Sequence, residues 1–219
     1  MSTESAERKA EPAETRSDVV SIIEALLLAI VALLVGWSGF ASTRWSTASR
    51  LTLAQSSSDR GQATRALLEA MEARNFDAST FNAWFAAYSI GNREAMRVAE
   101  RRFRPEFAVA FEAWRATSPD TNANAPKGPT YLPQYKQPDA VRATALDAKA
   151  DKEHLEGVHA AGNANDYART TVYLATVLFL VGISRHFQVR AARFGLLAVG
   201  AVVLIFAVTS LATLPGPPA

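Results

Sequence analysis

Two histidines in the second half of the chain have the spacing that comes nearest to a metal site. His154 and His159 lie in the sequence DKEHLEGVH, in which Glu156 precedes His159 by three residues. Carboxylate-bridged di-iron bundles use this Glu-x-x-His spacing, but they need a second such pair and further carboxylates from other helices. A separation of five residues also splays the two rings apart on a helix. We therefore interpret the segment as a solvated, charged helix face, and we expect no metal ion and no cofactor.

One acidic residue, Glu24, lies inside a long apolar run near the N-terminus. Carboxylates within a membrane span can mark proton or ion paths. If Trp37 and Trp45 bracket the opposite interface, Glu24 falls about 32 Å from Trp45 along a helix, near the other layer of headgroups. The sequence therefore favours an interfacial Glu24, and a functional or helix-pairing role is the alternative.

Asp166 and Arg169 are a polar pair, three residues apart, at the predicted outer membrane boundary. A local ion pair, or side chains that extend to the headgroups, explains them, and a role in binding a partner is the alternative.

Composition and motifs argue against several classes of function. The 219 residues include no cysteine, which excludes disulfides, thiol chemistry and Cys-based metal sites. The sequence has no Gly-rich phosphate loop, nucleophile elbow or metalloprotease helix. The net charge is only +2, and the Lys and Arg residues are scattered along the chain. We expect a protein that is not an enzyme and does not bind nucleic acid.

Three stretches are apolar and long enough to cross a hydrocarbon core about 30 Å thick. Residues 18–40 form the first predicted span, residues 167–184 the second and residues 194–214 the third. The third stretch has no charged residue, and three prolines follow it, which ends the helix. The chain is therefore predicted to be a multi-pass membrane protein in contact with the lipid bilayer.

Basic residues in short loops predict the orientation. The link of residues 185–193 holds Arg185, Arg190 and Arg193, so it should be cytoplasmic. The N-terminal tail, residues 1–17, is then cytoplasmic too, and its polar composition predicts disorder. Residues 41–166 and the tail 215–219 should lie outside a plasma membrane of bacterial type.

A cleaved signal peptide is the competing interpretation of the first span. Gly39 and Ala41 would supply the small residues before the cleavage point. A long leader and Glu24 within the apolar run argue against it.

Residues 41–166 show helical spacing on both sides of a proline-rich stretch. Helices are predicted over residues 44–74, with a break or kink at Gly61 from an Asp59-x-x-Gln62 capping box, and again over 78–90. Gly91 and Asn92 resemble a C-cap and an N-cap, and another aromatic helix follows, with Pro105 as its kink or as the start of a new segment. From Val141 a helical pattern continues into the second span. We expect an all-α protein, with an antiparallel helical bundle continuous with the first two spans.

Five of the ten prolines fall within residues 118–139, which must be an extended connection. Within it, Tyr131, Leu132 and Tyr135 form an apolar, aromatic stretch that is suited to binding a partner. The alternative is that these side chains cover the bundle's own helices. The aromatic cluster of Trp84, Phe85, Phe103, Phe107 and Trp114 presents the same choice between core and ligand pocket, and its helical spacing favours core.

The first span leads into GFASTRWSTASRLTLAQ, and NANDYARTTVYLATVLFLVGIS leads into the second. On these segments the chain resembles uncharacterised bacterial multi-pass membrane proteins with an extracytoplasmic helical domain. The family is of unknown function, so the resemblance implies a topology and no residue roles. The topology is also similar to the sensor region of chemoreceptors, but here a short basic loop and a third span follow the second span, and no output domain does.

Three hypotheses for the function follow. The first is an accessory or scaffold subunit that binds a protein partner through its outer helical domain, with a homo-oligomer as the other arrangement. The second is a ligand-binding sensor that lacks its own output domain. The third is a small transporter or channel that oligomerises around Glu24.

Overall fold

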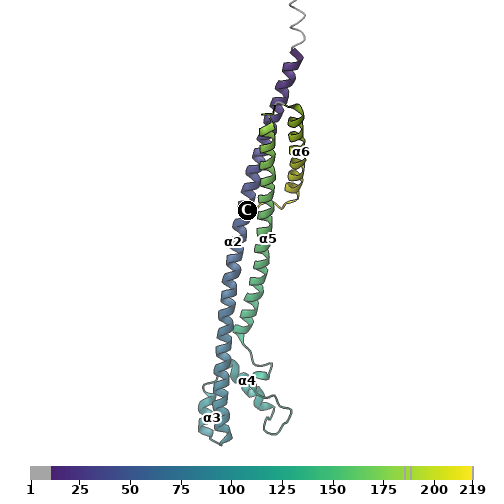
Figure 1. The fold of residues 1–219 in the computed structure, drawn as a ribbon. Coiled ribbons are helices and arrows are strands. Elements are labelled where there is room, and N and C mark those ends of the chain that lie inside the picture. The colour runs from purple at the N-terminus through teal and green to yellow at the C-terminus, as the bar shows by residue number, and fades with distance from the viewer. Residues whose placement is uncertain (1–10, 185, 188, 219) are drawn as a thin grey trace, which may run out of the picture. The chain divides into compact units, whose positions relative to one another are not determined.

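The computed structural model describes residues 11–184, 186–187 and 189–218, and within this part all regular structure is helical (Figure 1). Residues 1–10 of the predicted tail and Arg185 of the predicted basic link lie outside the described residues. The predicted all-α class is confirmed for the described part. The elements are α2 (Glu11–Ser89), α3 (Arg93–Glu100), α4 (Pro105–Ala116), the 3₁₀ helix η1 (Pro129–Tyr131), α5 (Pro138–Ser184) and α6 (Arg190–Thr213).

Three of these helices are long and apolar enough to cross a membrane. They are the apolar parts of α2, α5 and α6. The described residues form two compact units: unit 1 comprises residues 11–53 and the described residues between 154 and 218, and unit 2 comprises Ala54–Glu153. Helices α2 and α5 each contribute to both units, whereas α6 belongs to unit 1 alone.

Apolar side chains from all three of these helices form the core of unit 1. Val31 of α2, Leu174, Val177 and Val181 of α5, and Ala207 of α6 are buried together. Most other large apolar side chains of α6, such as Val202 and Ile205, are exposed. Exposed apolar side chains on a helix of this length suit contact with lipid.

Serine side chains join α2 to α5 in unit 1. Ser38 donates to the carbonyl of Tyr167 (2.9 Å), Ser42 to that of Ala164 (2.9 Å) and Ser49 to that of Gly157 (2.8 Å). As the serine number rises the carbonyl number falls, so the two helices run antiparallel. Unit 2 repeats the contact, from Ser56 to the carbonyl of Ala150 (2.7 Å).

Two contacts attach the segment that follows α6 to the other helices of unit 1. The Tyr167 hydroxyl donates to the carbonyl of Pro215 (2.9 Å), and the Arg44 guanidinium donates twice to the carbonyl of Pro218 (3.2 and 3.1 Å). The end of α6 therefore lies at the level of Tyr167 on α5 and Arg44 on α2.

An aromatic core fills unit 2. Trp84 of α2, Ala99 of α3, and Phe107, Phe111 and Trp114 of α4 are buried together, with Phe81 and Phe103 against them. The rings meet mostly edge to face, as between Trp84 and Phe111, whose centroids are 4.8 Å apart. The predicted place of the aromatic cluster in the core is confirmed for Trp84, Phe103, Phe107 and Trp114, whereas Phe85 is half exposed.

The predicted caps between α2 and α4 are confirmed. Gly91 has a positive φ of 70°, and the backbone N–H of Asn92 returns to the carbonyl of Ala87. The Asn92 side chain then accepts from the N–H of Ala95 at the start of α3. Pro105 begins α4 as a separate helix, because a proline at the first helical position loses no hydrogen bond.

The predicted interruption of the first long helix is wrong. Helix α2 passes through Gly61 and through residues 75–77 without a break. Asp59 does not cap a helix: it is almost fully buried, and Lys149 of α5 approaches its carboxylate to 2.8 Å. A single glycine costs a helix only about 1 kcal/mol, which the tertiary contacts on either side of it offset.

Candidate functional site

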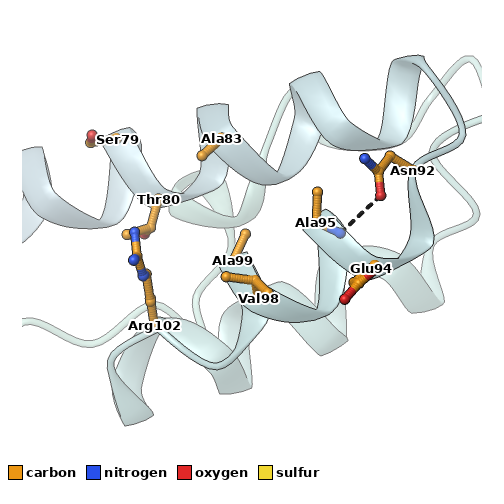
Figure 2. A pocket seen from close by; sticks show the side chains of 9 residues that line it. All are labelled: Ser79, Thr80, Ala83, Asn92, Glu94, Ala95, Val98, Ala99 and Arg102. Atoms are coloured by element: carbon orange, nitrogen blue, oxygen red, sulfur yellow. Dashed lines mark hydrogen bonds between the residues drawn. The ribbon is translucent and has the colours of Figure 1, made fainter.

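A groove lies between the end of α2 and α3, in unit 2 (Figure 2). Its volume is about 540 Å³. We call it the α2–α3 groove. Its lining residues are Ser79, Thr80 and Ala83 of α2, the capping residue Asn92, Glu94, Ala95, Val98 and Ala99 of α3, and Arg102.

Small side chains account for the space in this groove. Ala83 on one helix faces the side of α3 that carries Ala95 and Ala99 (Figure 2), and none of these side chains can fill the gap. Larger neighbouring residues of the same helices, including Met96 of α3 and Trp84 of α2, pack into the aromatic core. That packing fixes how α3 lies against α2 and leaves the small-residue side open.

The groove has charges of opposite sign toward its two ends. Glu94 lies near the cap formed by Asn92, and Arg102 lies beside Thr80 (Figure 2). Glu94 is in the first turn of α3, and Arg102 lies just beyond the C-terminal end of this helix. The Thr80 hydroxyl donates to the carbonyls of Phe76 and Asp77, so it is engaged within α2. The arrangement suits binding of an elongated group with charge of both signs.

The three residues predicted to bind a partner have different environments. The Tyr131 side chain is 67% exposed. Leu132, by contrast, packs against the aromatic core, and the Tyr135 ring meets Phe107 edge to face at 6.1 Å. The proline-rich segment thus covers the core of its own unit with two of these residues and presents only Tyr131 of the three to solvent.

A buried carboxylate that the sequence analysis did not single out holds this segment in place. Asp77 of α2 is fully buried, and the Arg104 guanidinium donates to both of its oxygens at 3.0 Å. The Tyr135 hydroxyl donates to Asp77 Oδ2 at 2.8 Å. This cluster ties α2 to the start of α4 and to the end of the proline-rich segment.

The cluster raises the pKa of two side chains, Tyr135 and Arg104. Burial raises the pKa of Tyr135, and the hydrogen bond to Asp77 raises it further. The hydrogen bond to Asp77 also raises the pKa of Arg104, against the effect of burial. An aspartate within a polar helical sequence gives no sign of this role, because its partners are 27 and 58 residues away.

Asp59 forms a second polar cluster, between α2 and α5 in unit 2. Gln55 and Gln62 donate to its Oδ1, and Lys149 lies close to both Asp59 and Glu153. The hydrogen bond from Lys149 lowers the pKa of Asp59, more than burial raises it. The cluster joins the two helices where the neighbouring contacts are made by small residues.

Glu24, the acid predicted within the first span, is buried in unit 1 and paired with Arg193 of α6. The Arg193 guanidinium donates to Glu24 Oε1. The contact joins the start of α6 to α2, so it has the geometry of the helix-pairing role that the sequence left open. At the other boundary, Arg169 donates to Asp166 Oδ1 at 2.6 Å, and both side chains remain about half exposed.

His154 and His159 are both exposed on α5. Among the described residues, no group of three or more His, Asp or Glu side chains is arranged to hold a metal ion. The aromatic cluster is mainly core. Trp84 and Trp114 also line a hollow of about 270 Å³ beside Asp120, whose carboxylate accepts a hydrogen bond from the Tyr88 hydroxyl at 2.7 Å.

Comparison of this chain with models of protein families, with curated proteins and with solved structures found no match in any of the three.

Proposed function

We propose that this chain is a non-catalytic accessory or scaffold subunit of a bacterial-type plasma membrane. In this proposal the N-terminus and the link between α5 and α6 are cytoplasmic, and residues 41–166 are extracytoplasmic. Three helices that are long and apolar enough to cross a membrane, together with the basic residues of the short link, support this placement. The outer helices bind a protein partner.

The α2–α3 groove carries this proposal, and its shape and charge favour an amphipathic helix as the occupant. Its walls are two helices, and a groove of this kind accommodates apolar side chains at positions i, i+3 or i+4, and i+7 of a third helix. Small residues on both walls leave room for those side chains. Glu94 and Arg102 favour a helix with a basic residue at one end of the contact and an acidic residue at the other.

The test is purification of the tagged full-length protein in a mild detergent, with mass spectrometry of proteins that accompany it in stoichiometric amount. Ala95→Phe fills the groove, Arg102→Glu reverses its charge, and Tyr131→Ala serves as the matched control on the other exposed surface. We expect the first two variants to lose the partner at least tenfold and Tyr131→Ala to retain it.

The results distinguish an error in the proposed binding site from an error in the proposed function. If only Tyr131→Ala loses the partner, the proline-rich segment is the binding surface and the groove is not. If the wild-type protein purifies as a homo-oligomer without any other protein, the scaffold proposal is wrong.

A ligand-binding sensor without its own output domain is the second candidate. A volume of about 540 Å³ lies within the range of about 300–1,000 Å³ that small-molecule sites occupy. The opposite charges of Glu94 and Arg102 would suit a zwitterionic small molecule. Such a molecule, retained through purification of the wild-type protein and absent from Ala95→Phe, would favour this candidate over the scaffold.

A further inference from the structure

A smaller hollow lies in unit 1, between α5 and α6. Its volume is about 210 Å³. Asp166 and Arg169 of α5 line one end, and Tyr173 of α5 and Phe206 of α6 line the other. Because α5 and α6 run antiparallel here, Ser210 and Thr213 of α6 lie at the charged end. The hollow therefore changes from polar to apolar along the two helices.

The charged end offers both signs of charge at one place. Arg169 Nη2 donates to Asp166 Oδ1 at 2.6 Å, and their side chains are 62% and 46% exposed. A guanidinium has five N–H donors and a carboxylate has two acceptor oxygens, so this single bond uses only part of their capacity. An incoming group with a negative and a positive charge could bond to both residues while their own pair persists.

The apolar end begins within the second span. From Asp166 to Tyr173 is seven residues, about 10 Å along the helix. The Tyr173 and Phe206 rings meet edge to face with their centroids 5.4 Å apart, and Phe206 is half exposed. A tyrosine ring is apolar and its hydroxyl is polar, so Tyr173 suits the boundary between the headgroups and the acyl chains, and Phe206 is wholly apolar. The distance matches the step from a phospholipid headgroup to the upper part of its acyl chains.

We propose that this hollow binds a zwitterionic phospholipid with a primary ammonium headgroup, as in phosphatidylethanolamine. The phosphate accepts hydrogen bonds from Arg169, the ammonium donates to Asp166, and an acyl chain lies against Tyr173 and Phe206. A choline headgroup has no N–H to donate to Asp166, and a glycerol headgroup brings no positive charge to it. The inference depends on α5 and α6 crossing a membrane and not on the proposed protein partner.

The test is native mass spectrometry of the full-length protein in detergent, titrated with one lipid at a time. The lipids are phosphatidylethanolamine, phosphatidylcholine and phosphatidylglycerol with identical acyl chains, and free glycerophosphoethanolamine is added as competitor. We expect phosphatidylethanolamine to bind about tenfold more tightly than the other two lipids. Asp166→Asn should remove this preference, and Arg169→Gln should weaken binding of all three lipids. Arg60→Gln, which breaks an exposed ion pair in unit 2, is the matched control and should change nothing.

Each other outcome overturns the proposal. If the wild-type protein binds the three lipids with equal affinity, the proposal is wrong. This comparison needs no variant, so it remains decisive even if a variant fails to fold. Full displacement by the free headgroup compound would assign the site to a soluble phosphate ester. Retention of the lipid preference in Asp166→Asn, or its loss in Arg60→Gln, would place lipid binding elsewhere on the protein.

Discussion

At the scale of single residues, the described structure depends on a few polar side chains buried between helices. Asp77, Asp59 and Glu24 are each less than a tenth exposed. Each lies beside a cation from another element: Arg104 at the N-cap of α4, Lys149 of α5 and Arg193 of α6. A buried charge without a partner is costly, so each pair specifies which helices meet and at what level.

Asp77→Ala is predicted to destabilise unit 2 by about 3 kcal/mol. The change leaves the Arg104 guanidinium and the Tyr135 hydroxyl without their shared acceptor. The expected loss of unfolding free energy is at the low end of the range for broken buried ion pairs, because Arg104 is partly exposed to water. Urea unfolding followed by tryptophan fluorescence checks this, because Trp84 and Trp114 lie in the adjoining core.

Arg60→Gln serves as control for that measurement. It removes ion pairs with Asp147 and Asp151 that are about half exposed, and should cost under about 1 kcal/mol. Equal losses in the two variants would contradict a special role for Asp77.

Tyr135 is predicted to ionise only above its ordinary pKa of 10.0, because burial and the bond to Asp77 both favour the neutral phenol. A folded pKa above the unfolded one means that the stabilisation is complete below about pH 10 and is lost as the pH rises through the folded pKa. The measurement is tyrosinate absorbance of the wild-type protein minus that of Tyr135→Phe. A difference already complete at pH 10 would disprove the buried hydrogen bond.

At the scale of elements, α2 and α5 pack closely because their shared seam is made of small residues. The serines donate to backbone carbonyls at positions where the facing residues include Ala150, Gly157 and Ala164. A serine hydroxyl reaches the backbone of a neighbouring helix only when no larger side chain intervenes. The seven-residue spacing of Ser42, Ser49 and Ser56 therefore sets the register of the pair.

Gly157→Ala is predicted to destabilise the pairing of α2 and α5 in unit 1 by about 1–2 kcal/mol. A β-carbon there would lie 2.7 Å from Cγ and 3.3 Å from the backbone nitrogen of Leu53. Thermal unfolding followed by far-ultraviolet circular dichroism measures the loss.

Gly162→Ala on the same helix is the control for this change. No atom lies within 4 Å of its added β-carbon, so the gain in helix propensity, up to about 1 kcal/mol, should appear as stabilisation. If both substitutions stabilise the protein, α2 and α5 do not pack as closely as described.

At the scale of the whole molecule, the orientation of the proposed topology is open to a direct test because the chain has no cysteine of its own. Asn124→Cys in the proline-rich segment should react with a membrane-impermeant maleimide on intact cells. Ser5→Cys in the tail and His186→Cys in the link should react only after the cells are permeabilised. Labelling of His186→Cys on intact cells would reverse the predicted orientation.

Features that depend on residues close together in the chain were predictable from the sequence, and features that depend on distant residues were not. Residue composition and periodicity predicted the helical class, the three apolar spans, the Gly91–Asn92 caps and the break at Pro105, because these depend on neighbours along the chain. The seven-residue spacing of the serines is also present in the sequence. Their role in helix pairing, however, can be inferred only once the Ala and Gly residues of α5 that face them are known.

Only the tertiary structure decided the rest. Helix α2 continues through Gly61 and residues 75–77 because contacts with distant residues, such as Lys149 and Arg104, stabilise it there. The same long-range contacts turned Tyr135 inward and left the α2–α3 groove open beside Ala95. The sequence shows which side chains are present. Which of them come into contact depends on the packing of residues that are far apart in the chain, because burial and ion pairing arise only when folding brings those residues together.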